Sequence, residues 1–206
     1  MMISSFGPKI YKTKLDASIC QELEQIILTN ENRLELRANK YLVGYIEKEI
    51  DILQGIQTNV LPKLTDLVFE YLNVLETNIK VYKPFHRRDI KCTASWANIQ
   101  TENEYNPIHN HPTSDIVCVT FPAIDIKSEF KYVTNNNFKP GTLFFYYGDG
   151  DNLFHNNVCE VIPEVGDVYI FPGSLKHSTA PIFDNDIRIS TSTNFSFTEY
   201  FRMKLV

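Results

Sequence analysis

The chain has 206 residues, of which 43% are hydrophobic and 13% aromatic, a composition typical of a folded protein with a substantial core. The formal net charge of −5 argues against a nucleic-acid partner, because phosphate binding requires a basic surface. The chain has no run of 18 apolar residues and no signal-peptide pattern, so we expect a cytoplasmic protein without a membrane partner.

The first 80 residues have a mainly helical pattern. A helix is predicted after Asp16, which can cap it, because apolar residues from Ile19 to Ile27 recur at helical spacing. A second helix is predicted from Thr58 through Leu72. The stretch 41–51 is ambiguous and is predicted to be a loop. We interpret residues 1–80 as a helical appendage that packs on one sheet of the following core.

From residue 81 to residue 206 the pattern changes to short strands separated by turn residues. The predicted strands are residues 92–99, 116–121, 142–147, 159–163, 167–171 and 187–197. In the first strand, alternation places one set of side chains on a common face: Cys92, Ala94, Trp96 and Asn98. Asn135–Asn137 and residues 148–152 are predicted loops. Short strands without a long helix are typical of a sandwich or barrel, so the core is predicted to be mainly β.

Three of the five histidines occur in a pattern typical of a metal site. Residues i and i+2 of an extended segment point the same way, so His109 and His111 can bind one ion from one face. His177 follows a predicted strand and a Pro-Gly turn, and neighbouring strands of a jelly roll can bring it beside the first pair. Imidazole suits iron, zinc, copper and nickel, so the ligand type does not choose the metal.

Two stretches, Trp96 to His111 and Gly166 to Asn194, resemble the iron(II)- and 2-oxoglutarate-dependent oxygenase superfamily, in particular its poorly characterised bacterial and phage members. This resemblance implies a double-stranded β-helix, or jelly roll, with the N-terminal helices on one sheet. It also implies that His109, His111 and His177 bind iron(II), and that the enzyme is a dioxygenase, a hydroxylase of a small molecule or a peptide.

The resemblance further implies an arginine after the distal histidine that binds the far carboxylate of 2-oxoglutarate. Arg188-Ile-Ser190 fits this role, because a guanidinium holds a carboxylate with two hydrogen bonds and the serine hydroxyl adds a third. Asn98 is a weaker candidate for binding the cosubstrate, and Trp96 for binding the substrate. Structural packing explains Asn98 equally well.

The second position of the iron motif departs from the usual His-x-Asp/Glu pattern of the superfamily. Three neutral imidazoles leave the ion with more net charge, for which the anionic cosubstrate would compensate. Alternatively, Asp115 supplies the carboxylate ligand or accepts a hydrogen bond from a ligand.

The chain also resembles the cupins, which share the jelly roll. Their first motif fits the stretch from His109 to Asp115 with Asp in place of Glu, and their second is nearly matched from Gly166 to His177. Arg188 separates the two families. If Ile187 and Ile189 face an outer core layer, Arg188 faces the lumen, where it needs an anion, and this favours the oxygenase. A third interpretation is a metal-binding or ligand-binding jelly roll without catalysis.

Overall fold

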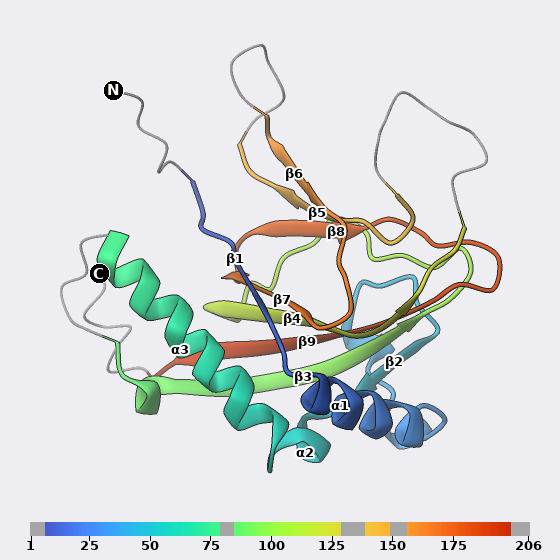
Figure 1. Ribbon diagram of the computed structural model, residues 1–206, viewed down its shortest axis with the longest axis horizontal. Coiled ribbons are helices and arrows are strands. Elements are labelled where there is room, and N and C mark those ends of the chain that lie inside the picture. Colours follow the sequence, from blue (N-terminus) through green and yellow to red (C-terminus); the bar gives the residue numbers. More distant parts are fainter. Residues whose placement is uncertain (1–6, 79–84, 129–138, 149–155, 199–206) are drawn as a thin grey trace.

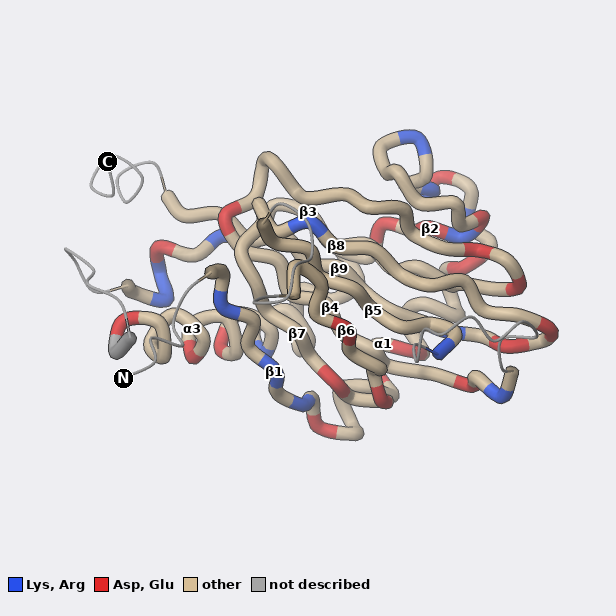
Figure 2. The backbone as a smooth tube through the Cα atoms, turned by 90° about the horizontal axis from the view of Figure 1, so that it is seen from above, with Lys and Arg blue, Asp and Glu red and all other residues tan. Residues whose placement is uncertain are grey.

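The structure is a computed structural model that describes residues 7–78, 85–128, 139–148 and 156–198. Two antiparallel sheets lie face to face, and the helices cover the outer face of the larger sheet (Figure 1). The predicted loops at Asn135–Asn137 and residues 149–152 lie outside the described residues. Acidic and basic residues are interspersed over the described part of the chain (Figure 2).

The larger sheet has six strands. Its order is β1 (Tyr11–Lys14), β7 (Asp167–Pro172), β4 (Ile116–Asp125), β9 (Ile187–Phe197), β3 (Ile90–Gln100) and β2 (Lys48–Asp51). The smaller sheet has the order β6 (Val158–Val161), β5 (Leu143–Tyr146) and β8 (Lys176–Thr179). The mainly β, two-sheet architecture expected from the sequence is therefore present.

The helices are α1 (Ala17–Asn30), α2 (Leu53–Ile56) and α3 (Val60–Asn78), with three short 3-10 turns, Leu34–Leu36, Asn39–Tyr41 and Arg87–Asp89. Asp16 is the N-cap residue of α1, as predicted, although its side chain makes no capping hydrogen bond. Within the described residues, no helix combines the length and the apolar character needed to cross a membrane.

Both predicted helices exist, but the stretch between them is not entirely a loop. Residues 48–51 form β2, which pairs with β3 at the edge of the larger sheet. The sequence Lys-Glu-Ile-Asp has too few apolar residues to indicate a strand, and the strand is stabilised by pairing and by Ile50, which is fully buried. Thus both edge strands, β1 and β2, come from the first 80 residues. The division of the chain near residue 80 stays a prediction.

The hydrophobic core has two layers. One lies between the helices and the outer face of the larger sheet, and includes Leu23, Leu64, Ile170 and Ile189. The other lies between the two sheets, around Phe121, Phe145, Tyr169 and Phe171. β4 and β7 contribute to both layers, which explains their continuous apolar sequence.

The predicted face of Cys92 is wrong. The register of β3 against β9 shifts between Cys92 and Ala94, so that Cys92 pairs with Phe195 and Ala94 pairs with Asn194. One extra residue in a strand reverses the faces on either side of it. Cys92 therefore packs in the core layer under the helices, whereas Ala94, Trp96 and Asn98 line a cavity between the sheets.

Candidate metal centre and active-site pocket

The backbone brings the three histidines together from two separate segments. His109 and His111 lie in the connection between β3 and β4, and His177 lies in β8. The backbone N–H of His109 donates to the carbonyl oxygen of His177 (3.0 Å), and that of His177 donates to the carbonyl oxygen of His109 (2.9 Å). The backbone N–H of His111 donates to the carbonyl oxygen of Gly173 (2.8 Å). Three hydrogen bonds thus fix the connection to β8 and the turn before it.

The imidazole rings converge. One potential ligand atom from each of His109, His111 and His177 lies within 4.8 Å of the others. Among the described residues, this is the only group of three or more His, Cys, Asp or Glu side chains close enough to hold a metal ion. The structure thus brings together the three histidines that the sequence analysis singled out.

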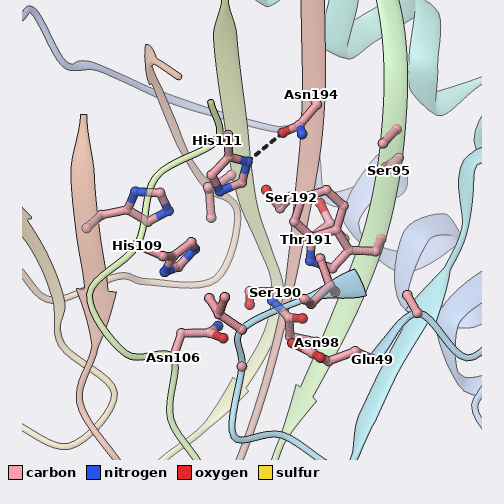
Figure 3. A pocket seen from close by; sticks show the side chains of 18 of the residues that line it. Glu49, Ser95, Asn98, Asn106, His109, His111, Ser190, Thr191, Ser192 and Asn194 are labelled. Atoms are coloured by element: carbon pink, nitrogen blue, oxygen red, sulfur yellow. Dashed lines mark hydrogen bonds between the residues drawn. The ribbon is translucent and has the colours of Figure 1, made fainter. Parts of the chain in front are cut away.

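Each ring has its Nδ1 atom next to an acceptor. Nδ1 of His109 lies 2.8 Å from the carbonyl oxygen of Pro107, and Nδ1 of His177 lies 3.0 Å from that of Leu175. Nδ1 of His111 lies 2.7 Å from Oδ1 of Asn194 (Figure 3). An Nδ1–H donor at each of these contacts leaves the Nε2 lone pair free for a metal.

The site also keeps its imidazoles neutral. Burial lowers the pKa of His111 to about 4 and that of His177 to about 3, and it lowers the pKa of His109 as well. Neutral imidazole is the form that binds metal ions. Three neutral nitrogen donors in one cluster, each with an outer acceptor, fit a divalent transition metal such as iron(II).

Asp115 lies outside this cluster. Its Oδ2 atom accepts a hydrogen bond from the backbone N–H of Phe197 (2.8 Å), and its own N–H donates to the carbonyl oxygen of Phe195. The structure thus places the Asp115 carboxylate at the end of β9, where it fastens the strand. The acceptor beside His111 is Asn194, which the sequence analysis did not single out.

A cavity of about 410 Å³ opens beside the histidines, between the two sheets. Side chains at alternate positions of β9 line it, namely Arg188, Ser190, Ser192 and Asn194, and their partners on β3 include Asn98, Trp96 and Ala94. The opposite face of β9 carries Ile189 and Phe195, which pack under the helices. The predicted alternation, with Arg188 and Ser190 facing the interior, is therefore present.

Arg188 is a buried cation in this cavity. It is 2% exposed, and burial lowers the pKa of its guanidinium to about 10. Its Nη1 donates to the carbonyl oxygen of Gly141 (2.9 Å) and its Nη2 to Oγ of Ser190 (3.4 Å), while Nε has no partner. The salt bridges found among the described residues do not include Arg188. A buried guanidinium with an unused N–H group fits the carboxylate of an anionic cosubstrate.

The weaker candidates also lie at the site. The ring of Trp96 stacks on that of His111, with centroids 5.4 Å apart and planes at 19°. Asn98 lines the cavity, and its Oδ1 atom is buried without a hydrogen-bond partner. Two further residues were missed. Glu49 of β2 is a buried carboxylate in the lining, and Gly173 packs against the histidine connection.

The fold and the site together define a two-sheet β protein with three converging histidines and a buried arginine that line one cavity. A family model described as "Putative 2OG-Fe(II) oxygenase" matches residues 94–194, which contain the histidines, Arg188 and Ser190. This match covers just under half of the chain and gives it the sequence signature of an iron(II)- and 2-oxoglutarate-dependent oxygenase. The family match therefore favours the oxygenase over the cupin and non-catalytic interpretations.

Solved structures share the fold at low sequence identity. A prolyl-4-hydroxylase from Pseudomonas putida is 14% identical over 92% of both chains, with a TM-score of 0.59. A viral collagen prolyl hydroxylase from Paramecium bursaria Chlorella virus-1, in complex with 2-oxoglutarate, is 11% identical over 92% of this chain and 96% of that one (TM-score 0.58). The α-ketoglutarate-dependent epimerase SnoN from nogalamycin biosynthesis is 12% identical over 92% and 79% (TM-score 0.59). No curated protein matches the chain in sequence.

Proposed function

We propose that this oxygenase hydroxylates a C–H bond of a small molecule or a peptide, with His109, His111 and His177 as the iron(II) ligands and with Arg188 and Ser190 as the anchor for 2-oxoglutarate. The observation that carries the proposal is the buried guanidinium beside the histidine cluster. A buried cation without a carboxylate partner is costly unless a ligand supplies the anion. The buried Arg188 guanidinium therefore favours an enzyme that binds an anionic cosubstrate.

The protein itself holds iron(II) and 2-oxoglutarate and orients the side chains that bind them. When bound, iron(II) and 2-oxoglutarate supply the oxidising chemistry, in which the cosubstrate is decarboxylated to succinate while one oxygen atom enters the substrate. The acceptors on Pro107, Asn194 and Leu175 keep the three imidazoles in the Nδ1–H tautomer. With His109, His111 and His177 as its only protein ligands, a bound ion would remain accessible to the cosubstrate from the cavity. The apolar layer around Phe171 and Phe145 packs against His177 and limits the access of water from that side.

The anchor sets the position of the cosubstrate. Arg188 is held from one side by the Gly141 carbonyl and lies over the ring of Phe121, with its central carbon 5.1 Å from the centroid. Its direction is therefore fixed before the cosubstrate arrives, and Nε–H, one further N–H on each Nη and the hydroxyl hydrogen of Ser190 remain to be paired. Such preorganisation strengthens binding, because little side-chain freedom is lost.

An anaerobic titration of the iron(II)-loaded protein with 2-oxoglutarate tests the proposal, with the visible metal-to-ligand charge-transfer band as readout. We expect the band in the parent protein. In Arg188→Ala and Arg188→Lys, the midpoint should move to roughly 10- to 100-fold higher 2-oxoglutarate, because a charge-assisted, two-pronged contact is lost. Equal midpoints would refute the anchor. A parent protein that binds iron(II) but never forms the band would refute the proposed use of the cosubstrate.

The ligand set has its own test. His177→Ala should lose iron(II) binding at concentrations that saturate the parent protein. His86→Ala is a matched control, because His86 lies outside the cluster. If His177→Ala bound iron(II) as tightly as the parent does, the three-histidine centre would be wrong.

A further inference from the structure

The cavity contains a second buried ionisable group that the proposed reaction does not use. Glu49 lies on β2, is 1% exposed and lines the cavity. Its Oε2 atom is buried and has no hydrogen-bond partner. A buried polar atom of this kind costs free energy in the empty protein unless a ligand pairs with it.

The sheet register fixes where Glu49 stands relative to the anchor. Glu49 of β2 pairs directly with Asn98 of β3, and Asn98 pairs with Ser190 of β9. Directly paired residues present their side chains on the same face, so the three form one row across neighbouring strands. Glu49 is thus two strand spacings, about 10 Å, from Ser190. The row leads from the cosubstrate anchor to the far end of the cavity.

The end of the row is rich in acceptor oxygens. Oδ1 of Asn98 is buried and unpaired like Oε2 of Glu49. A Cβ atom built on Gly44 would lie 2.2 Å from Oε1 of Glu49 and 2.5 Å from Oδ1 of Asn106, so these two oxygens flank the same small space. Figure 3 shows Glu49 and Asn98 side by side near Ser190, with Asn106 across the cavity. Convergent acceptors need a ligand that brings hydrogen-bond donors.

The charged side chains of the cavity indicate which kind of hydrogen-bond donor a ligand would bring. Apart from the three histidines, the charged side chains among the described lining residues are Glu49, Asp51 and Arg188. Asp51 already accepts a hydrogen bond from the backbone N–H of Leu53 (2.9 Å). The far carboxylate of 2-oxoglutarate would pair with Arg188, and its other carboxylate would lie beside the histidines. Glu49 is then the buried carboxylate of the lining whose Oε2 atom still has no hydrogen-bond partner.

We propose that Glu49, with Asn98 beside it, is the substrate-recognition site of this enzyme and selects substrates that carry a cationic nitrogen, an ammonium or a guanidinium group. This inference rests on the proposed function, because it assigns the substrate class of the same site. An ammonium or guanidinium brings several N–H donors and the positive charge that Glu49 requires. The substrate would hold its cationic end at β2 and present a C–H bond toward the histidines.

The segment before β2 supports a role in substrate binding. Ala38 and residues 41–44 line the cavity, and Tyr41 and Val43 among them are 77% and 58% exposed. The side chains of Tyr41 and Val43 line the cavity and are not packed in the protein core. They can cover the aliphatic part of a substrate whose charged nitrogen lies deeper, at Glu49.

Matched pairs of compounds test the inference. Nα-acetyl-L-lysine amide is compared with Nα-acetyl-L-norleucine amide, and the arginine compound with the citrulline compound blocked in the same way, so that the side chain carries the only positive charge and each pair differs chiefly in it. The same pairs are presented within blocked tripeptides, as acetyl-Gly-X-Gly-amide. The protein is first shown to form the charge-transfer band with iron(II) and 2-oxoglutarate, and succinate release is then measured in air. We expect at least one cationic compound to raise succinate release about 30-fold or more above its uncharged partner.

Glu49→Gln removes the charge and keeps the shape, and it should abolish that preference while the charge-transfer band persists. Glu47→Gln is the control, because Glu47 is exposed and lies outside the cavity lining. The comparison in the parent protein stands without the variant, should Glu49→Gln fail to fold. The inference is overturned if no cationic compound exceeds its uncharged partner, or if Glu49→Gln keeps the preference. Absence of the band in the parent protein would instead overturn the proposed function.

Discussion

His109 and His177 exchange two backbone hydrogen bonds, one in each direction, although they belong to distant parts of the sequence. This pairing makes the metal site a feature of the backbone before any side chain binds an ion. Two ligands are set opposite each other by the ladder of an antiparallel bridge, and His111 is added by its bond to Gly173.

Gly173 should be indispensable to this arrangement. A Cβ atom at this position would lie 2.1 Å from the carbonyl oxygen of Ser114 and 2.9 Å from that of His111. Gly173→Ala must therefore push the histidine connection away from β8. We expect unfolding to become about 1–3 kcal/mol more favourable, with a clear loss of iron(II) affinity. Thermal denaturation and metal titration measure the two effects. Ser174→Ala, at the exposed neighbouring position, should resemble the parent in both, and so would Gly173→Ala if the close contact were unimportant.

Asn194 should tune metal affinity without touching the metal. Its Oδ1 atom accepts the Nδ1–H of His111 and so fixes the tautomer of that ring. Loss of such an outer contact typically weakens metal binding roughly 10- to 100-fold. We expect this loss in Asn194→Ala and a substantial recovery in Asn194→Asp, which restores an acceptor. Calorimetric titration with cobalt(II) measures it. Equal affinity in Asn194→Ala and the parent would contradict the role.

Glu49 should make the stability of the protein without ligands depend on pH. Burial, with a smaller contribution from the charge of Glu104, raises the pKa of the Glu49 carboxyl to about 7. Between about pH 4.5 and 7 the unfolded chain has released this proton while the folded protein retains it. The stability that the proton provides is complete below this window and is lost as the pH rises through it.

The difference in unfolding free energy between the parent and Glu49→Gln should therefore shift by ~3 kcal/mol against the parent across that window. Urea denaturation of both proteins at pH 4.5, 6 and 7.5 measures the shift. A constant difference over these three values would show that Glu49 titrates normally. Glu47→Gln, at an exposed position, should show no such trend.

Asp167 should stabilise the pairing of the edge strand β1 with β7 in the larger sheet. Its carboxylate is fully buried and pairs with Lys12 of β1 at 2.8 Å, and it also accepts the backbone N–H of Glu164 (3.0 Å). Burial alone would raise the pKa of Asp167, but the hydrogen bonds from Lys12, the Glu164 backbone and Lys14, together with the charge of Lys12, outweigh it and the pKa is lowered. Asp167→Asn should cost about 2–4 kcal/mol of stability by denaturant unfolding. Glu164→Gln removes only an exposed partner of Lys14 and should cost under about 1 kcal/mol. Similar costs for both variants would contradict the argument.

The local periodicity of the sequence was sufficient to predict some elements of this structure. β9 begins and ends where its alternation predicts, because Ile189 and Phe195 pack under the helices while Arg188 and Ser190 face the cavity. The same alternation, continued in steps of two from Arg188, reaches Asn194. Asn194 could therefore have been predicted from the sequence, because it occupies a cavity-facing position further along a strand that was already predicted.

Other features depend on pairing that no local pattern records. Cys92 changes face because of a register shift, and such a shift has no signal in the alternation that surrounds it. Glu49 lies on a short edge strand whose own sequence is polar, and it becomes a cavity residue only because β2 pairs with β3 opposite Asn98. The predicted helices gave no hint that the first 80 residues also supply both edges of the sheet that contains the site.

Trp96 gives the metal centre an optical label. It is the only tryptophan in the chain, and its indole lies against the His111 ring. All tryptophan fluorescence of this protein therefore originates next to the proposed metal site. A paramagnetic ion such as cobalt(II) should quench that emission as it loads, so that occupancy can be followed by light in the unmodified protein, in real time and in stopped flow.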